Sequence, residues 1–444
     1  VYAGILPMEV VDLLIEARWI VPVEPAEVVL ENHAVAVDDG RIVAVLPQNE
    51  AATRFSARSH KRLEQHVLLP GLVNLHTHAA MSLLRGLADD LPLMEWLQHH
   101  IWPAEAQHVS EQFVYDGTRL ACAEMLRGGI TCFNDMYFFP GAAADAVLAS
   151  GIRAAIGLIT VDFPSNYATD TDDYLAKGLA ARDQRLDEPL LSFCLAPHAP
   201  YTVSDAGFAK VLTLAEQLEL PIHLHLHETV QEIDESVQRF GMRPLERLRR
   251  LGLLSPALIA VHGVHLDAHD IELLAQHGCS LAHCPSSNLK LASGIAPVSA
   301  LVGKGVNIGL GTDGAASNNR LDLLQEMRLA ALLAKEQSGR ADALNAHQVL
   351  HMATLAGARA LGLDAQIGSI TPGKAADLCA VALDDLLLAP CYQPVSHLTY
   401  AVGREHVSAV WVAGRMRVEN GQLLESNETG LIKLALLWQN KIRP

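Results

Sequence analysis

Two histidines follow a short apolar run near the start of the chain. His76 and His78 lie in the segment Leu72–Ala79, which is apolar enough to form a buried strand. Because side chains alternate along a strand, both imidazoles are expected to point to the same side. Paired imidazoles suit a borderline metal ion such as Zn²⁺, which needs two or three further ligands. A chain with 21 histidines forms such pairs by chance, so this pair gains meaning only from matching residues elsewhere.

A segment in the middle of the chain, Pro221–Glu228, carries three more histidines. His223, His225 and His227 alternate, so we expect them to face one side of a strand. Alternation does not decide which of the three binds a metal. Glu228 has the opposite parity and stands where the strand gives way to a loop.

Two further segments carry single polar residues near their ends. Leu258–Val264 contains His262, and the apolar run of Asn307–Gly314 ends at Asp313. Alone, His262 is more often a core histidine, and Asp313 could cap a following helix. Buried imidazoles and carboxylates are costly, however, unless they bind a ligand or one another. Their positions at the ends of separate strands therefore predict one shared metal site.

The predicted site holds one metal ion. The segment Leu191–His198 ends in His198 and has no lysine that could be carboxylated to bridge two ions. Imidazole and carboxylate ligands suit Zn²⁺, which is the ion we expect, although iron, manganese and nickel accept the same ligands.

Eight β-rich segments alternate with helical segments between residues 69 and 365. This alternation predicts a closed, TIM-like (β/α)8 barrel of the α/β class, with its active site at the C-terminal ends of the strands. The expected strands are Leu72–Ala79, Ile130–Tyr137, Arg153–Thr160, Leu191–His198, Pro221–Glu228, Leu258–Val264, Ser280–Ser286 and Asn307–Gly314. The expected helices include Phe208–Leu218, Pro244–Leu251, Asp267–Gln276, Asp322–Lys335 and Ala346–Leu361, the last of which should cover one end of the barrel.

Short strands without helical periodicity are expected at both ends of the chain. We expect residues 1–68 and 366–444 to build one small β-sandwich domain, with the barrel of residues 69–365 inserted between its two parts. The β-rich segments are Val10–Ala17, Val35–Val37, Arg41–Leu46, Asp377–Val381, Val395–Tyr400 and Val407–Val412.

Composition excludes several kinds of partner. The net charge of −17 argues against a nucleic-acid partner, and the chain contains no apolar run of 18 residues that predicts a membrane span. Seven scattered cysteines without a C-x-x-C pair, and no signal-peptide pattern, favour a cytoplasmic location. A homo-oligomer stays open, because the apolar runs near 320–335 and 430–438 could face either a partner or the barrel.

Eight motifs point to one known family. They are Pro70-Gly-Leu-Val-Asn-Leu-His-Thr-His78, Trp102-Pro-Ala-Glu105, Ala196-Pro-His198, His223-Leu-His-Leu-His-Glu228, Val261-His-Gly-Val-His-Leu266, Pro285-Ser-Ser-Asn-Leu-Lys-Leu291, Gly311-Thr-Asp-Gly-Ala-Ala-Ser-Asn-Asn319 and Gly368-Ser-Ile-Thr-Pro-Gly-Lys-Ala-Ala-Asp377. With these motifs the chain resembles the amidohydrolase superfamily over nearly its whole length. The branch that it resembles most is that of the 5-methylthioadenosine/S-adenosylhomocysteine deaminases.

The resemblance implies roles for particular residues. Its glutamate motif places the metal ligand three residues earlier, which selects His225 from the three alternating histidines. It also implies that Glu105 binds ribose hydroxyls, although from the residues alone Glu105 could equally be a solvated carboxylate in a first helical turn. The implied metal ligands are His76, His78, His225 and Asp313, and the implied substrate-binding residues are Glu105, His198, Glu228 and Asp313.

The reaction implied by this resemblance is hydrolytic removal of the C6 amine from an adenine nucleoside, a small-molecule substrate. One divalent ion would lower the pKa of a water molecule, Asp313 would accept its proton, and His262 would orient the resulting hydroxide. Glu228 would protonate N1 of the ring, and ammonia would leave with a proton from Asp313. The catalytic residues are then Glu228, His262 and Asp313, and no organic cofactor is expected.

The preferred substituent at the 5′ position can also be predicted. The resemblance implies that family members accepting S-adenosylhomocysteine hold its carboxylate with arginines after the third strand. Gly157–Tyr167 contains no arginine, whereas Phe163, Pro164 and Tyr167 suit an apolar group. We therefore expect 5′-methylthioadenosine to be preferred, with adenosine and 5′-deoxyadenosine as lesser substrates. An arginine from a neighbouring subunit, or Arg85, would undermine this preference.

Three alternatives share much of this pattern. An s-triazine chloro- or aminohydrolase and a guanine deaminase of the same superfamily would use the same metal ligands, so only the pocket separates them. A non-catalytic scaffold on this fold is disfavoured, because the ligand set is complete.

Overall fold

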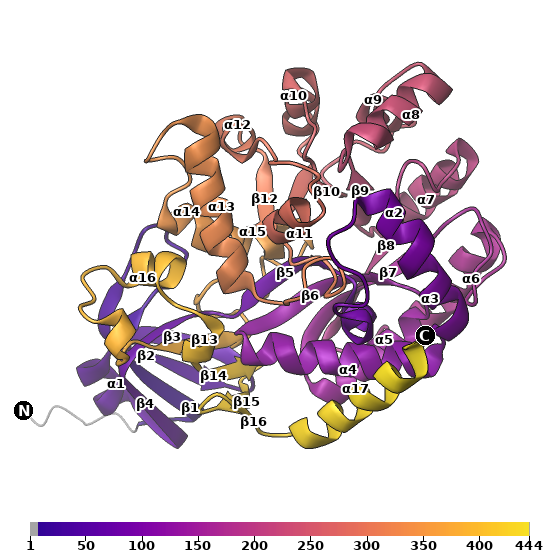
Figure 1. Ribbon diagram of the computed structural model, residues 1–444. Coiled ribbons are helices and arrows are strands. Elements are labelled where there is room, and N and C mark those ends of the chain that lie inside the picture. Colours follow the sequence, from indigo (N-terminus) through magenta and orange to yellow (C-terminus); the bar gives the residue numbers. More distant parts are fainter. Residues whose placement is uncertain (1–7, 444) are drawn as a thin grey trace, which may run out of the picture.

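The computed structural model of the chain describes residues 8–443 and contains two eight-stranded sheets (Figure 1). One is the predicted barrel, whose parallel strands follow one another in chain order. Its strands are β5 (Leu72–Thr77), β6 (Ile130–Tyr137), β7 (Arg153–Thr160), β8 (Leu191–Pro197), β9 (Ile222–Leu226), β10 (Leu258–His262), β11 (Ser280–His283) and β12 (Asn307–Leu310). All eight predicted strands are confirmed.

The first and last strands of the barrel are joined just beyond the end of β12. The backbone N–H of Asp313 donates to the carbonyl of His76 at 3.0 Å. The side-chain oxygen of Asn74 accepts from the N–H of Thr312 at 2.9 Å. These bonds bring the residue after the last strand directly against the first strand, which places Asp313 beside His76.

Several strands end sooner than the sequence predicts. Strand β9 ends at Leu226 rather than Glu228, and β11 ends at His283 rather than Ser286. In the second case Pro285 occupies the first turn of a helix, α11 (Pro285–Lys290), where its missing N–H costs nothing. In the first case His227, directly after the last strand residue, takes a left-handed φ of +54°, which ends the extended backbone.

Helices connect successive strands of the barrel and lie around its outside (Figure 1). Four predicted helices are found within a few residues of their expected bounds, as α7 (Asp205–Leu218), α9 (Pro244–Arg250), α10 (Ala268–Gln276) and α13 (Leu323–Ser338). The structure adds helices whose bounds were not predicted, namely α4 (Glu111–Arg127), α5 (Pro140–Ser150), α6 (Thr171–Asp183), α8 (Val230–Phe240) and α12 (Val298–Gly303).

Apolar packing closes the N-terminal end of the barrel. The predicted helix over residues 346–361 is broken at Thr354 into α14 (Ala346–Met352) and α15 (Leu355–Ala360). Residues of α15 and the following turn form one buried cluster with the inward-facing residues of the strands, among them Val73, Leu75, Ile259, Val261, Ala358 and Leu361. Apolar side chains therefore fill this end of the barrel, and the histidines lie toward the opposite end.

Both ends of the chain contribute to the second sheet, as predicted. Its strands run in the order β16-β15-β14-β13-β4-β1-β2-β3, and β13 from the C-terminal part pairs with β4 from the N-terminal part. The bounds are β1 (Glu9–Ile20), β2 (Leu30–Asp38), β3 (Arg41–Pro47), β4 (Phe55–Pro70), β13 (Leu378–Ala382), β14 (Val407–Val412), β15 (Arg415–Glu419) and β16 (Gln422–Leu423). The domain boundaries near residues 68 and 365 stay predictions.

Two expectations for the chain ends are wrong. A helix, α1 (Gln48–Arg54), interrupts the N-terminal strands, where no helical period was expected. Val395–Tyr400, expected as a strand, belongs to helix α16 (Pro394–Tyr400), whose proline stands in the first turn. Burial of Val395, Leu398 and Thr399 in this helix outweighs their preference for strands.

The apolar runs near 320–335 and 430–438 are both helical and behave differently. Helix α13 buries most of its apolar residues in the hydrophobic layer between the strands and the helices, whereas α17 (Glu428–Ile442) buries Leu431 and Trp438 and exposes Ile432, Leu436 and Leu437. The indole N–H of Trp438 donates to Asp116 of α4 at 2.9 Å.

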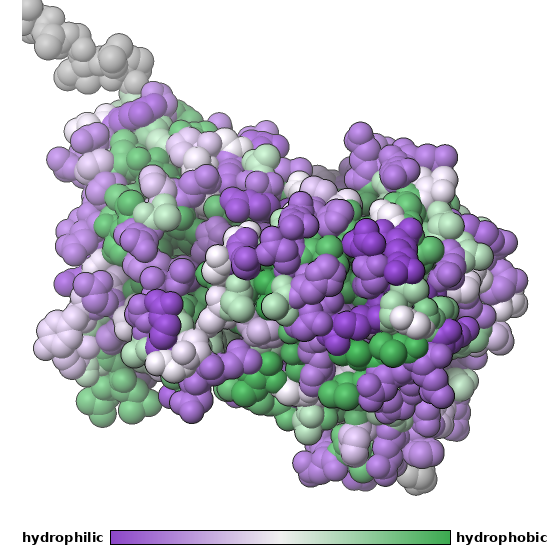
Figure 2. All heavy atoms as spheres, turned by 90° about the horizontal axis from the view of Figure 1, so that it is seen from above, coloured by the Kyte–Doolittle hydropathy of each residue, from purple (hydrophilic) through white to green (hydrophobic). Residues whose placement is uncertain are grey.

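Figure 2 shows mainly hydrophilic side chains over one face of the molecule, with hydrophobic residues between them. Within residues 8–443, no helix has the length and apolar character to cross a membrane.

A buried ion pair ties the second sheet to the barrel. Arg153 at the start of β7 donates from Nε and Nη2 to the two carboxylate oxygens of Asp377, at 2.9 and 3.3 Å. The side chains are 7% and 2% exposed. Asp377 also accepts from the N–H of Ala413 at 2.7 Å, so its carboxylate joins the barrel to the turn between β14 and β15.

We expect Asp377→Ala to destabilise the protein by about 3–5 kcal/mol, because it leaves the Arg153 guanidinium buried without a counter-charge. The midpoint of urea unfolding measures this. Asp342→Ala is the control, since it breaks an exposed pair with Arg340 that is worth about 0–1 kcal/mol. Equal midpoints for the two variants would contradict the structural role of the buried pair.

Candidate active site

Histidines from three parts of the barrel converge at its C-terminal end. The ring centroids of His76 and His78 are 4.8 Å apart, and those of His76 and His225 are 4.9 Å apart. One potential ligand atom from each of these three residues lies within 4.8 Å of the others, and the same holds for His76, His262 and Asp313. The structure thus brings together every residue that the sequence predicts as a metal ligand.

Hydrogen bonds fix the proton on the far nitrogen of two of these rings. His78 Nδ1 donates to the carbonyl oxygen of Met136 at 2.6 Å, and His225 Nδ1 donates to that of His198 at 2.7 Å. A carbonyl can only accept, so Nδ1 carries a hydrogen in both rings and Nε2 is the nitrogen left to bind another group. This is the arrangement of a histidine that binds a metal through Nε2.

The Nδ1 atom of His76 is also engaged, in this case by the ring of another histidine. Its Nδ1 lies 2.9 Å from Nε2 of His223. Its own Nε2 is buried without a hydrogen-bond partner, although Asp313 Oδ1 lies 3.3 Å from it and also 3.3 Å from His78 Nε2. Burial lowers the pKa of His76 to about 4, so the ring is neutral at pH 7. Imidazole nitrogens that converge on one carboxylate oxygen form a donor set that fits a divalent metal ion.

Asp313 is held as an ionised carboxylate. Its Oδ2 accepts from the Ser287 hydroxyl at 2.6 Å, and its Oδ1 accepts from the N–H of Gly314 at 2.7 Å. Burial alone would raise the pKa of Asp313, but the neighbouring His76 and His78 lower it well below its usual value. A charged acceptor therefore faces the imidazoles.

Backbone conformation at the strand ends aims the side chains. His227, His262 and Asp313 have φ of +54°, +73° and +59°, which non-glycine residues rarely adopt and which costs about 1–3 kcal/mol each. The turn at His227 breaks the alternation of strand β9. As a result, Glu228 lines the cavity, whereas the His227 ring lies behind the strand and accepts from the N–H of Leu245 at 3.1 Å. The expectation that all three alternating histidines face one side is therefore wrong for His227.

Glu228 stands opposite His262 across the site. Its Oε2 is 3.6 Å from His262 Nε2, and its backbone N–H donates to Glu232 at 2.8 Å. Burial, aided by the charge of Asp313, raises the pKa of Glu228 to about 7. His262 Nδ1 donates to the amide oxygen of Asn288 at 2.8 Å, which leaves Nε2 facing the site. Glu228 can therefore carry a proton near neutral pH.

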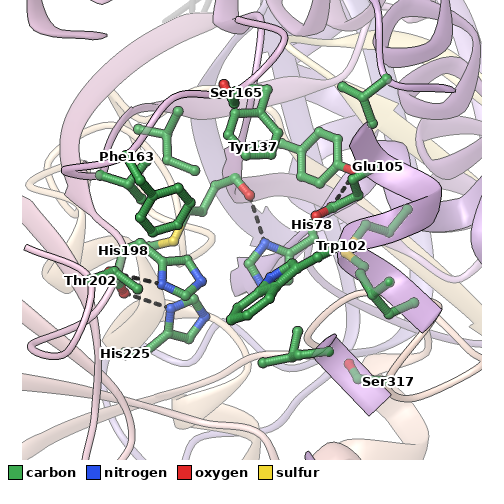
Figure 3. A pocket seen from close by; sticks show the side chains of 18 of the residues that line it. His78, Trp102, Glu105, Tyr137, Phe163, Ser165, His198, Thr202, His225 and Ser317 are labelled. Atoms are coloured by element: carbon green, nitrogen blue, oxygen red, sulfur yellow. Dashed lines mark hydrogen bonds between the residues drawn. The ribbon is translucent and has the colours of Figure 1, made fainter. Parts of the chain in front are cut away.

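These residues open into a cavity of about 440 Å³ (Figure 3). Glu105, from helix α3 (Trp102–His108), accepts from the hydroxyl of Tyr137 at 2.7 Å. Burial raises the pKa of Glu105 to about 7, against the opposing effect of this hydrogen bond. One turn of π-helix, Leu97–Ile101, precedes α3, and such turns occur often at functional sites.

The rest of the cavity wall is largely apolar. His198 lies beside His225, with ring centroids 4.8 Å apart, and burial lowers its pKa to about 3. Figure 3 shows Phe163 next to His198, on the side away from Glu105. Pro164 also lines the cavity. Among the described residues that line it, none is an arginine or a lysine.

Arg85, the residue that could have supplied a positive charge, lies elsewhere. Its guanidinium pairs with Glu124 and donates to the carbonyl of Asn319, and it does not line the cavity.

Several residues at the site carry no predicted role. Tyr137 ends the second predicted strand, a position that points to the active end of a barrel, and this position alone could have identified it. Trp102, Ser287 and Asn288 lie within motifs of the sequence, but no spacing rule assigns them a contact. Ser287 and Asn288 have partners on other parts of the barrel, Asp313 and His262, which become visible only in the folded structure.

Comparison with known proteins gives a consistent assignment. The amidohydrolase family profile matches residues 67–417. A protein of Saccharophagus degradans named 5-methylthioadenosine/S-adenosylhomocysteine deaminase is 47% identical over 432 residues, covering 97% of each chain. A relative of the same name from Teredinibacter turnerae is 46% identical over 97% of this chain and 98% of its own.

Solved structures agree with this comparison. The zinc-bound structure of an adenosine deaminase from Xanthomonas campestris has a TM-score of 0.97 and 51% identity, covering 98% of this chain and all of that one. The zinc complex of an atrazine chlorohydrolase from Arthrobacter aurescens has a TM-score of 0.89 at 24% identity, covering 96% of this chain and 99% of that one. At that identity the second likeness concerns the fold alone.

The two histidines His225 and His227 give a matched test of the metal site. We expect His225→Ala to lose most of its bound zinc, because one of the converging lone pairs is removed. His227→Gln should keep its zinc, since that ring lies behind the strand. Inductively coupled plasma mass spectrometry of the purified variants measures the zinc bound to each. Retention of zinc by His225→Ala, or its loss from His227→Gln alone, would contradict the ligand set.

Proposed function

The chain belongs to the amidohydrolase family, and we propose that it removes the C6 amino group of 5′-methylthioadenosine by hydrolysis. The observation that carries this proposal is the convergence of free imidazole nitrogens on Asp313, directly beside a protonatable Glu228. The same cavity holds Glu105, a carboxylate suited to hydroxyl groups.

One zinc ion is proposed to be held by His76, His78, His225 and Asp313. When bound, such an ion lowers the pKa of a water molecule toward neutrality and so supplies a nucleophile at physiological pH.

The protein's own groups then manage the protons. Asp313 accepts one proton from the attacking water, whose oxygen bonds to C6, and His262 orients this water through Nε2. Glu228 donates its proton to N1, so that the ring does not accumulate negative charge. The C6 hydroxyl then gives its proton to Glu228, which is thereby protonated again, while Asp313 passes its proton to the amine. The C–N bond breaks and ammonia leaves, so all protons are accounted for.

Substrate recognition is proposed to begin at the sugar. Tyr137 occupies Oε1 of Glu105, which leaves Oε2 to accept from a ribose hydroxyl. His198, whose depressed pKa keeps it neutral, is proposed to contact the substrate from the opposite wall. A free carboxylate oxygen at this position favours a nucleoside, whose ribose carries hydroxyl groups, over guanine or an s-triazine, which have none.

The 5′ substituent is proposed to be small and apolar. A carboxylate taken into this cavity would lose its hydration without gaining a charged partner, because no arginine or lysine lines the described wall. The methylthio group would instead pack near Phe163 and Pro164. S-Adenosylhomocysteine, which appears in the names of the relatives, is therefore proposed to be a weaker substrate here.

We also propose a cytoplasmic location for this enzyme. All seven cysteines are free thiols and six are buried, which suits a reducing compartment.

A panel of substrates tests the proposed function. We expect kcat/KM for 5′-methylthioadenosine to exceed that for S-adenosylhomocysteine by about tenfold or more, since burying an unpaired charge costs more than about 1.4 kcal/mol. Adenosine and 5′-deoxyadenosine should fall between them. The loss of adenine absorbance in the ultraviolet follows each reaction. Turnover of guanine or melamine without turnover of any adenosine would overturn the proposal, and equal values for the two thio-nucleosides would overturn the 5′ preference.

Glu228 provides a test of the proton path. Because its raised pKa keeps it protonated up to about pH 7, kcat/KM should fall as pH rises through that value. Glu228→Gln should retain zinc and fold, lose about 10²- to 10⁴-fold in kcat, and lack this descending limb. Near-full activity in this variant would show that another group protonates N1.

A further inference from the structure

The motif Pro285–Leu291 forms helix α11 and has no part in the chemistry described so far. It follows β11, a strand that contributes no metal ligand or proposed proton carrier. Two adjacent side chains of this helix are buried, Ser287 at 0% and Asn288 at 1% exposure, and neither lines the cavity. They cannot touch a substrate there, so any effect on the reaction must pass through other residues.

Each of the two side chains holds a different member of the catalytic set. The Ser287 hydroxyl donates to Oδ2 of Asp313 at 2.6 Å, a short hydrogen bond to a charged acceptor. The Asn288 amide oxygen accepts from Nδ1 of His262 at 2.8 Å. The first bond fixes the rotation of the carboxylate, so that Oδ1 faces the imidazoles. The second fixes the proton of His262 on Nδ1 and leaves the Nε2 lone pair directed at the site.

The helix is itself held against the loop that carries Asp313. Glu326 of α13 accepts from the N–H of Ser286 at 3.0 Å and from the side-chain amide of Asn318 at 2.9 Å. Asn318 in turn donates to the carbonyl of Thr312 at 2.7 Å. One buried carboxylate therefore joins the start of α11 to the residues on both sides of Asp313.

We propose that Ser287 and Asn288 are positioning residues, Ser287 for the carboxylate of Asp313 and Asn288 for the imidazole of His262. The seventh strand of the barrel then serves the reaction by supporting groups that the sixth and eighth strands supply. This inference rests on the proposed function for its kinetic arm and is independent of it for its metal-binding arm.

Ser287→Ala and Asn288→Leu are expected to have different effects on zinc affinity, which a general loss of stability would not produce. Ser287→Ala should lower both zinc affinity and kcat by about 10- to 100-fold, because it frees a proposed ligand to rotate. Asn288→Leu should lower kcat by a similar factor but leave zinc affinity unchanged, since His262 is not a proposed ligand. KM should stay within about twofold in both, because neither residue lines the cavity.

Ser286→Ala is the matched control. Ser286 is adjacent and also buried, and its hydroxyl lies near the side chains of Gln325 and Glu326 and has no bond to Asp313 or His262. Zinc affinity is measured by competition with a chromogenic chelator, kinetics by ultraviolet absorbance with 5′-methylthioadenosine, and fold by thermal melting. The control should match the unmodified protein in zinc affinity and kcat.

The outcomes separate the two proposals. Equal losses in Ser286→Ala and Ser287→Ala, or unchanged zinc affinity in Ser287→Ala, would overturn the role of Ser287. Loss of zinc affinity in Asn288→Leu, or an unchanged kcat, would overturn that of Asn288. If the unmodified protein deaminated no adenosine, the proposed function would fail, while the zinc comparison between Ser287→Ala and Ser286→Ala would still decide the carboxylate arm.

Discussion

Burial of imidazoles and a carboxylate at one end of an otherwise apolar barrel is the constraint on which this structure depends. Such groups are expensive to remove from water unless something compensates them. His76, with its lowered pKa and a buried Nε2 that has no hydrogen-bond partner, shows that the protein alone does not compensate them fully. A cation at the point where the lone pairs meet would do so, and the surrounding hydrogen bonds aim the rings at that point.

The N-terminal end of the barrel contributes stability, and the C-terminal end carries the proposed chemistry. The N-terminal end is closed by apolar packing of α15, and the second sheet is tied to the barrel by Arg153 and Asp377. This rigid part permits strained backbone at the other end, where His227, His262 and Asp313 adopt left-handed conformations. The strain has a use, since it turns Glu228 into the cavity and places Asp313 against the first strand. Stability is therefore concentrated away from the chemistry.

Much of this arrangement could be predicted from the sequence because barrel strands are short, apolar and regularly spaced. The eight strands and the convergence of His76, His78, His225 and Asp313 followed from that pattern together with the family motifs. What failed depended on contacts that no local pattern encodes. Tertiary burial made residues 395–400 helical, a left-handed turn reversed His227, and Pro285 ended β11 early. The supporting roles of Tyr137, Ser287 and Asn288 required partners from distant strands, so residue type and spacing could not reveal them.

The most direct test of the central claim is anomalous X-ray diffraction at the zinc absorption edge from crystals of the zinc-loaded protein. The account predicts one strong peak at the C-terminal end of the barrel, about 2.0–2.2 Å from Nε2 of His76, His78 and His225 and from a carboxylate oxygen of Asp313. A peak bound by other residues, or two peaks of equal strength in the cavity, would contradict it.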